Sequence, residues 1–66
     1  MNTSLLKGEI VAKYGSQKNF SKAIGWHQNK LSHMMTQKYI PDVVEATKIR
    51  TVLDLDNDKA SRIFLE

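Results

Sequence analysis

Three chain-breaking signals divide this 66-residue sequence into segments of helical length. Gly15 and Gly25 can each adopt the left-handed backbone conformation that ends a helix, and Pro41 disfavours helical geometry at the residue before it. Within the segments apolar residues recur at helical spacing, and no segment alternates apolar with polar residues for long. The pattern therefore predicts an all-α fold without a sheet.

The first two segments each carry a polar residue that can cap a helix. Ser4 is the expected cap of a first helix that ends at Gly15, and Ser16 is the expected cap of a second helix over residues 17–24. The first helix presents an apolar stripe made of Leu6, Ile10, Val11 and Tyr14. We expect this stripe to face the core.

The remaining segments predict three further helices. A third helix is expected to start at His27 or Gln28. The D-x-x-E pattern at residues 42–45 is typical of a capping box, so a fourth helix is expected over residues 43–53. Asp56 can cap a last short helix. The prediction is five short helices around one small core.

Length and composition indicate one domain, over residues 1–66. A core of this size is marginal and often gains stability from a partner chain. The absence of Cys excludes a disulfide framework and a thiolate metal site. No apolar run approaches the roughly 18 residues that span a bilayer, and the start lacks a signal-peptide pattern. We expect a soluble cytoplasmic domain without a membrane partner.

Acidic residues are missing from one half of the chain. The net charge is only +3, but no Asp or Glu lies between Ile10 and Pro41. The interval holds five lysines and both histidines, namely Lys13, Lys18, Lys22, Lys30, Lys38, His27 and His33. Such a one-sided basic surface suits a polyanion binder, and a solvated lysine-rich face without a partner is the alternative.

The basic half also contains two helical patterns joined by a sharp turn. Phe20 and Ile24 lie one turn apart before Gly25, and Leu31 and Met34 lie nearly one turn apart after it. If the last two face inward, the polar side chains that face outward are Gln28, Asn29, Ser32 and His33. The arrangement predicts a helix-turn-helix in the second and third helices, with the start of the third helix exposed.

The stretch QKNFSKAIGWHQNKLSHMM, residues 17–35, resembles the helix-turn-helix of the lambda-type Cro/C1 (XRE) family. The full chain also resembles the small regulators of that family carried by phages and mobile elements. Where family members often have Asn-Gly after the recognition helix, this chain has Thr36 and Gln37. The resemblance implies a sequence-specific double-stranded DNA-binding regulator, a Cro-like repressor that binds its operator through the major groove.

The resemblance also implies roles for individual residues. Base edges would be reached by His27, Gln28, Asn29 and His33. The DNA backbone would be contacted by Gln17, Lys18, Lys30, Ser32, Lys38 and Tyr39. A palindromic operator and a weak homodimer that is stronger on DNA are expected, and no small-molecule ligand or cofactor is expected.

Catalytic and metal sites find little support in the sequence. There is no Gly-rich phosphate loop and no plausible Ser-His-Asp set. His27 and His33 are spaced wrongly for one helix face. The DLDNDK stretch starts like a calcium loop, but Lys59 stands where that loop needs Gly and Leu65 where it needs Glu. We therefore expect neither an enzyme nor a metal site.

Two other functions remain open. One is an antitoxin-like or accessory regulator that also binds a protein partner. The other is a protein-interaction module that has lost DNA binding. The apolar tail of Ile63, Phe64 and Leu65 could cover the domain's own core or pair with a second copy of the chain.

Overall fold

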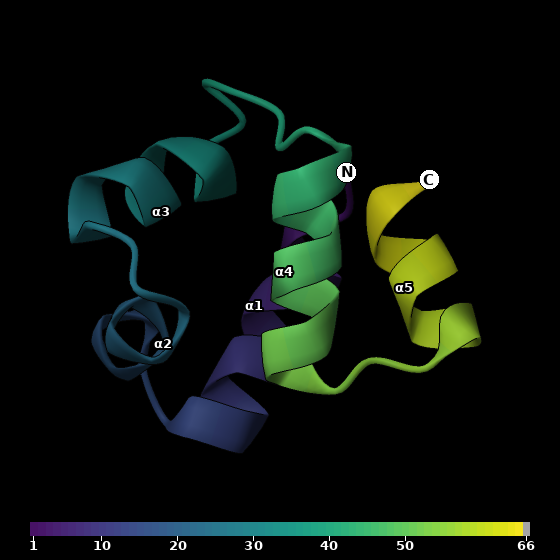
Figure 1. The fold of residues 1–66 in the computed structure, drawn as a ribbon, viewed down its shortest axis with the longest axis horizontal. Coiled ribbons are helices and arrows are strands. Elements are labelled where there is room, and N and C mark those ends of the chain that lie inside the picture. The colour runs from purple at the N-terminus through teal and green to yellow at the C-terminus, as the bar shows by residue number, and fades with distance from the viewer. Residues whose placement is uncertain (66) are drawn as a thin grey trace.

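The computed structural model describes residues 1–65 and contains five α-helices, with no strand in that range (Figure 1). In chain order the helices are α1 (Thr3–Tyr14), α2 (Gln17–Ile24), α3 (Gln28–Met35), α4 (Val43–Leu53) and α5 (Asn57–Phe64). The predicted all-α fold of five short helices is confirmed. None of these helices is long and apolar enough to cross a bilayer.

Most helix boundaries follow local signals in the sequence. Ser16 Oγ and Asp56 Oδ1 each accept a hydrogen bond from the backbone N–H three residues ahead, at 3.1 and 2.7 Å. At the start of α4, Asp42 Oδ1 accepts from the N–H of Glu45 at 2.8 Å, and Glu45 Oε1 accepts from the N–H of Asp42 at 3.2 Å. The predicted caps of α2 and α5 and the capping box of α4 are therefore confirmed.

The first helix ends where the sequence predicts but starts earlier. Gly15 has a φ of +81° and terminates α1. The cap is Asn2, because Asn2 Oδ1 accepts from the N–H of Leu5 at 3.0 Å. The N–H of Asn2 also donates to the carbonyl of Ile63 at 2.7 Å, which ties the start of α1 to α5. The prediction of Ser4 as the cap is wrong.

The apolar stripe of α1 is narrower than predicted. Leu6 and Ile10 are fully buried, and the half-buried ring of Tyr14 lies 5.5 Å from that of Phe20, centroid to centroid. Val11, in contrast, is 48 % exposed. It lies about 100° around the helix from Ile10, because each residue of an α-helix advances the direction by that angle. Val11 therefore lies outside the core face.

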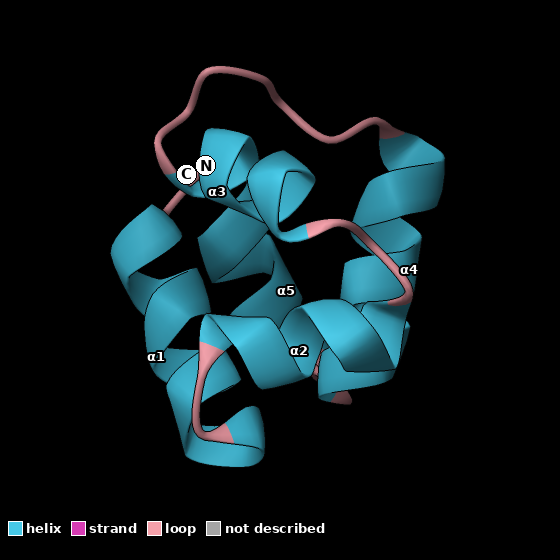
Figure 2. Cartoon of the chain, turned by 90° about the vertical axis from the view of Figure 1, so that its left-hand side faces the viewer, coloured by secondary structure: helices cyan, strands magenta, loops and turns pink. Residues whose placement is uncertain are grey.

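One hydrophobic core joins all five helices. α1 packs against α2, α4 and α5, and α2 packs in turn against α3 and α4. The buried apolar residues are Leu6, Ile10, Phe20, Ile24, Leu31, Met34, Ile49, Leu53, Leu55, Ala60 and Ile63. Both views show α3 beside α2 (Figures 1 and 2), and Figure 1 shows α3 and α5 at opposite sides of the molecule. The backbone of α3 is thus attached to the other helices mainly through α2.

Gln37, just after the end of α3, has a backbone conformation that is unfavourable for a residue with a side chain. Its φ is +60°, in the left-handed region. The N–H of Gln37 donates to the carbonyl of Met34 at 3.0 Å, and the N–H of Lys38 donates to that of His33 at 2.8 Å. These two bonds close the C-terminus of α3, so the structure holds Gln37 in this conformation.

The Gln37→Gly variant is expected to be more stable than the parent by about 1 kcal/mol, since glycine adopts the left-handed region without steric cost. Urea unfolding followed by circular dichroism measures this change. Gln37→Ala is the matched control, because alanine keeps the strain, and its stability should stay near that of the parent. Equal stabilisation by both variants would show that side-chain removal, not backbone strain, is responsible.

Candidate nucleic-acid interface

A tight turn joins α2 to α3. Gly25 adopts the left-handed conformation, with φ +78° and ψ +24°. Its N–H and that of Trp26 both donate to the carbonyl of Ser21, at 2.9 and 3.0 Å. Ser21 is itself buried, and its hydroxyl donates to the carbonyl of Lys18 at 2.7 Å. These bonds fix the direction in which α3 leaves α2.

The first residues of α2 and of α3 share one depression at the surface. A depression of about 340 Å³ is lined by Gln17, Lys18, Gln28, Asn29, Leu31 and Ser32. All of these except Leu31 are residues that the sequence predicts to contact DNA. The structure therefore gathers five predicted contact residues into one small area.

A second polar depression continues the first. It has a volume of about 290 Å³ and shares Gln17 and Ser32 with the first depression. Its other lining residues are Thr3, Ser4, Lys7, Met35 and Thr36. We call the two linings together the polar surface. Among the described residues, no Asp or Glu belongs to it.

Sequence reasoning missed the part of the polar surface contributed by α1. Thr3 and Lys7 are four residues apart, so they lie on one face of α1, and this spacing was the available signal. The sequence could not show that this face meets Gln17 of α2 and Ser32 of α3. The structure thus adds Lys7 to the cations near the predicted interface.

The start of α2 favours an anion for a further reason. The first N–H groups of a helix have no acceptor within the helix. Ser16 caps the N–H of Asn19, which leaves those of Gln17 and Lys18 available at the positive end of the helix dipole. The side chain of Lys18 adds a full positive charge at the same place.

Two histidines belong to α3 or its cap. His27 caps α3 by accepting a hydrogen bond at Nδ1 from the N–H of Asn29, at 3.1 Å. The neutral ring then carries its proton on Nε2, so it can donate a hydrogen bond. His33 is exposed one turn after Asn29 and lines neither depression. Lys38 is exposed just beyond the end of α3.

The two remaining predicted contact residues turn toward a carboxylate. Lys30 Nζ lies 2.6 Å from Glu45 Oε2 on α4, and the Tyr39 hydroxyl donates to the same oxygen at 3.3 Å. The hydrogen bond from Lys30 lowers the pKa of Glu45, and the bond from the N–H of Asp42 adds to this effect. The same ion pair raises the pKa of Lys30. Lys30 and Tyr39 are therefore engaged within the protein.

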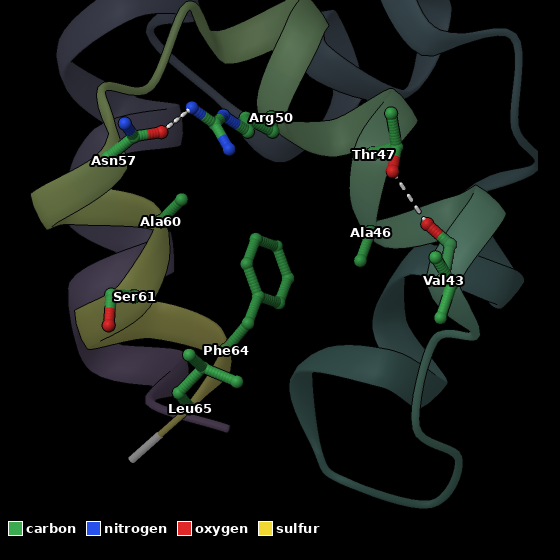
Figure 3. Close-up of a pocket in the computed structure, with 9 residues that line it drawn as sticks. All are labelled: Val43, Ala46, Thr47, Arg50, Asn57, Ala60, Ser61, Phe64 and Leu65. Carbon is green, nitrogen blue, oxygen red and sulfur yellow. Dashed lines mark hydrogen bonds between the residues drawn. The ribbon is translucent and has the colours of Figure 1, made fainter.

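An apolar groove, separate from the polar surface, lies between α4 and α5 (Figure 3). It has a volume of about 290 Å³ and is lined by Val43, Ala46, Thr47, Arg50, Asn57, Ala60, Ser61, Phe64 and Leu65. Arg50 donates a hydrogen bond to Asn57 across one end, while the half-buried ring of Phe64 projects toward α4. The tail is divided: Ile63 is fully buried in the core, whereas Leu65 is 82 % exposed.

The described residues offer no metal centre. Within residues 1–65, no three His, Cys, Asp or Glu side chains come close enough together to hold a metal ion. Glu45 at the start of α4 pairs with Lys30 of α3, and Asp42 and Glu45 also form the capping box. The polar surface itself offers hydrogen-bonding side chains and the positive charges of Lys7 and Lys18.

Comparison with known proteins gives one kind of match. A family model described as "Protein of unknown function (DUF739)" matches residues 1–66. No curated protein and no solved structure matches the chain. Because the family model covers every residue of the sequence, the protein belongs to the DUF739 family.

Proposed function

We propose that this protein is a sequence-specific double-stranded DNA-binding regulator that uses α2 and α3 as a helix-turn-helix. The observation that carries the proposal is the depression between the starts of these helices, which Lys18 lines together with Gln28 and Asn29. Cation and amide together are the combination that duplex recognition needs, because lysines hold phosphates while amides read bases. The resemblance of residues 17–35 to the Cro/C1 family supports the same function.

Two kinds of contact with DNA are proposed, one to base edges and one to phosphates. α3 enters the major groove, which is wide enough to admit a helix, and presents Gln28 and Asn29 to base edges. Lys7, Lys18 and Lys38 hold phosphates on either side of the groove. The base contacts set the sequence, and the phosphate contacts set the register and much of the affinity.

A Cro-type repressor is the form of regulator that we propose. One recognition helix reads only a few base pairs, so two copies on a palindromic operator give sufficient specificity. Such a pair blocks polymerase by occupying the operator in the cytoplasm, with no small-molecule ligand. Association of the free protein is weak in this proposal, and it is strengthened when both copies hold the same duplex.

An accessory or antitoxin-like regulator is the second candidate. The observation that favours it is the apolar groove between α4 and α5, beside which Val43 and Leu65 are each 82 % exposed. Exposed apolar surface of this kind marks protein-interaction sites. A protein-interaction module that has lost DNA binding would use this groove alone.

Mobility shift with random duplex separates DNA binding from the protein-only module. Two subunits that each use three lysines neutralise about six phosphates, which predicts a slope of about −5 for log affinity against log salt. Binding with such a slope supports the proposed function. No shift at low salt with folded protein would reject DNA binding and favour the interaction module.

The Lys18→Ala variant is expected to bind every duplex more weakly, with a salt slope shallower by about 1 per subunit, because a phosphate contact carries no sequence information. Titration of specific and random duplex at several salt concentrations measures this. Arg62→Ala is the matched control, since it removes the same charge from α5, away from α3 (Figure 1). Equal effects of the two variants would mean that net charge, not the polar surface, governs binding.

A further inference from the structure

Four segments of the chain meet around the ion pair of Lys30 and Glu45. Glu45 Oε2 contacts Lys30 and Tyr39, and Glu45 Oε1 accepts a hydrogen bond from the N–H of Asp42 at 3.2 Å. The Nζ of Lys30 also lies over the ring of Trp26, 4.4 Å from its centroid. The cluster thus includes the turn before α3, α3 itself, the loop over residues 36–42 and α4.

This cluster connects two helices whose backbones do not approach closely. α3 packs against α2, and its close contacts with α4 are few. The Lys30 side chain is 40 % exposed and that of Glu45 only 21 % exposed, so the ion pair is partly shielded from solvent. A cation on an indole face gains further attraction from the ring. The cluster therefore couples the orientation of α3 to α4.

The position of Lys30 matters for DNA binding. A lysine at this point of α3 lies next to Asn29 and would reach a phosphate if it were free. A phosphate contact would add affinity for every sequence equally. An internal carboxylate that occupies this lysine removes that contribution and leaves discrimination to the amides.

We propose that Glu45 is a positioning residue for DNA recognition, which holds Lys30 against Trp26 and away from the phosphates. This inference rests on the proposed function, since it concerns how α3 meets a duplex. Glu45 keeps Lys30 from strengthening random binding and fixes the angle of α3 relative to α4. It is thereby a determinant of specificity that contacts no DNA.

Glu45→Gln and Lys30→Met test the inference. Glutamine can still accept the capping-box bond through its amide oxygen, so α4 keeps its start. Its uncharged NH₂ group then replaces the oxygen that faces Lys30. Methionine keeps much of the apolar stem of Lys30 over Trp26 and removes the ammonium. Circular dichroism checks the fold of each variant, and Lys30→Met decides the question if Glu45→Gln fails to fold.

Fluorescence gives a readout that needs no DNA. Trp26 is the sole tryptophan of the chain, so its emission reports the cluster directly. Both variants are expected to change the emission of Trp26, because Glu45→Gln removes the charge that holds the ammonium over the ring and Lys30→Met removes the ammonium itself. Unchanged emission in both variants would show that Lys30 does not occupy this position, and would overturn the inference.

Salt titration on DNA gives the second readout. Glu45→Gln is expected to steepen the slope by about 1 per subunit, which is a roughly fourfold greater loss of affinity for each subunit between 50 and 200 mM salt. It should also bind random duplex more tightly and discriminate less well. Lys30→Met should keep the parent slope, unlike Lys18→Ala. A higher affinity of Glu45→Gln for random duplex would not be explained by a damaged fold, because a damaged fold would weaken binding.

Glu9→Gln is the matched control, because Glu9 forms its own ion pair with Lys59 at 3.1 Å, between α1 and α5. It should leave the slope and the emission of Trp26 unchanged. A shallower slope in Lys30→Met would place Lys30 on a phosphate and overturn the inference while leaving the proposed function intact. If the parent itself binds no DNA, the proposed function fails and the inference fails with it.

Discussion

The Phe20→Ala variant is expected to lose about 3–5 kcal/mol of unfolding free energy, the usual cost of truncating a buried Phe. Phe20 is fully buried in α2 and lies against the ring of Tyr14. A domain of this length has a total stability of only about 3–10 kcal/mol, so the loss removes much or all of it. Urea unfolding followed by circular dichroism measures the change.

Val11→Ala is the control for this prediction. It also truncates an apolar side chain, but that side chain lies on the neighbouring helix α1 and is 48 % exposed. Its effect should stay within about 0.5 kcal/mol. Similar stabilities for Phe20→Ala and Val11→Ala would mean that α2 is not docked on the core as described. The polar surface would then lack a rigid support.

The Gln28→Ala and Asn29→Ala variants are expected to lose about 1–3 kcal/mol on the specific site, because a side-chain amide can pair with both N6 and N7 of adenine in the major groove. We expect adenine at one or two positions near the outer part of each half-site, and the preference there should relax in the variants. Salt slopes should hardly change. Competition titrations with single-base variants of the selected site measure the effect.

Asn57→Ala provides the amide control, since Asn57 lies on α5 at the opposite side of the molecule from α3 (Figure 1). It should keep the full preference of the parent. Neither Gln28 nor Asn29 contributes to the core, so circular dichroism should show that both variants fold. Full specificity in folded Gln28→Ala and Asn29→Ala would show that α3 is not the recognition helix.

Features encoded within a few residues were the ones that could be predicted. Ser16, Asp56 and the capping box at residues 42–45 act on backbone groups three residues away, and Gly15 and Gly25 act at their own positions. Such signals do not depend on the rest of the fold. The number and order of helices, and most of their ends, therefore followed from the sequence.

The start of α1 shows where local signals fail. Both Asn2 and Ser4 are good capping residues, and local pattern does not choose between them. The choice depends on the bond from Asn2 to the carbonyl of Ile63, at the other end of the chain. The exposed position of Val11 has a similar origin, because the width of the buried face depends on how α1 sits against its neighbours.

The candidate site was predictable in part for the same reason. Gln17, Lys18, Gln28 and Asn29 belong to one continuous stretch, and the turn at Gly25 brings them together. Lys30 and Tyr39 differ, because their partner is Glu45 on α4. Local spacing shows that these side chains can reach the surface, but it does not show which charge they meet there.

The most direct test of the proposed function is selection of bound duplexes from a random pool by the folded parent protein. A Cro-type repressor should enrich one palindromic site with adenine in each half, and this result would also establish that two copies bind together. Recovery of duplexes without any common sequence, from a protein that circular dichroism shows to be folded, would contradict sequence-specific recognition by α3.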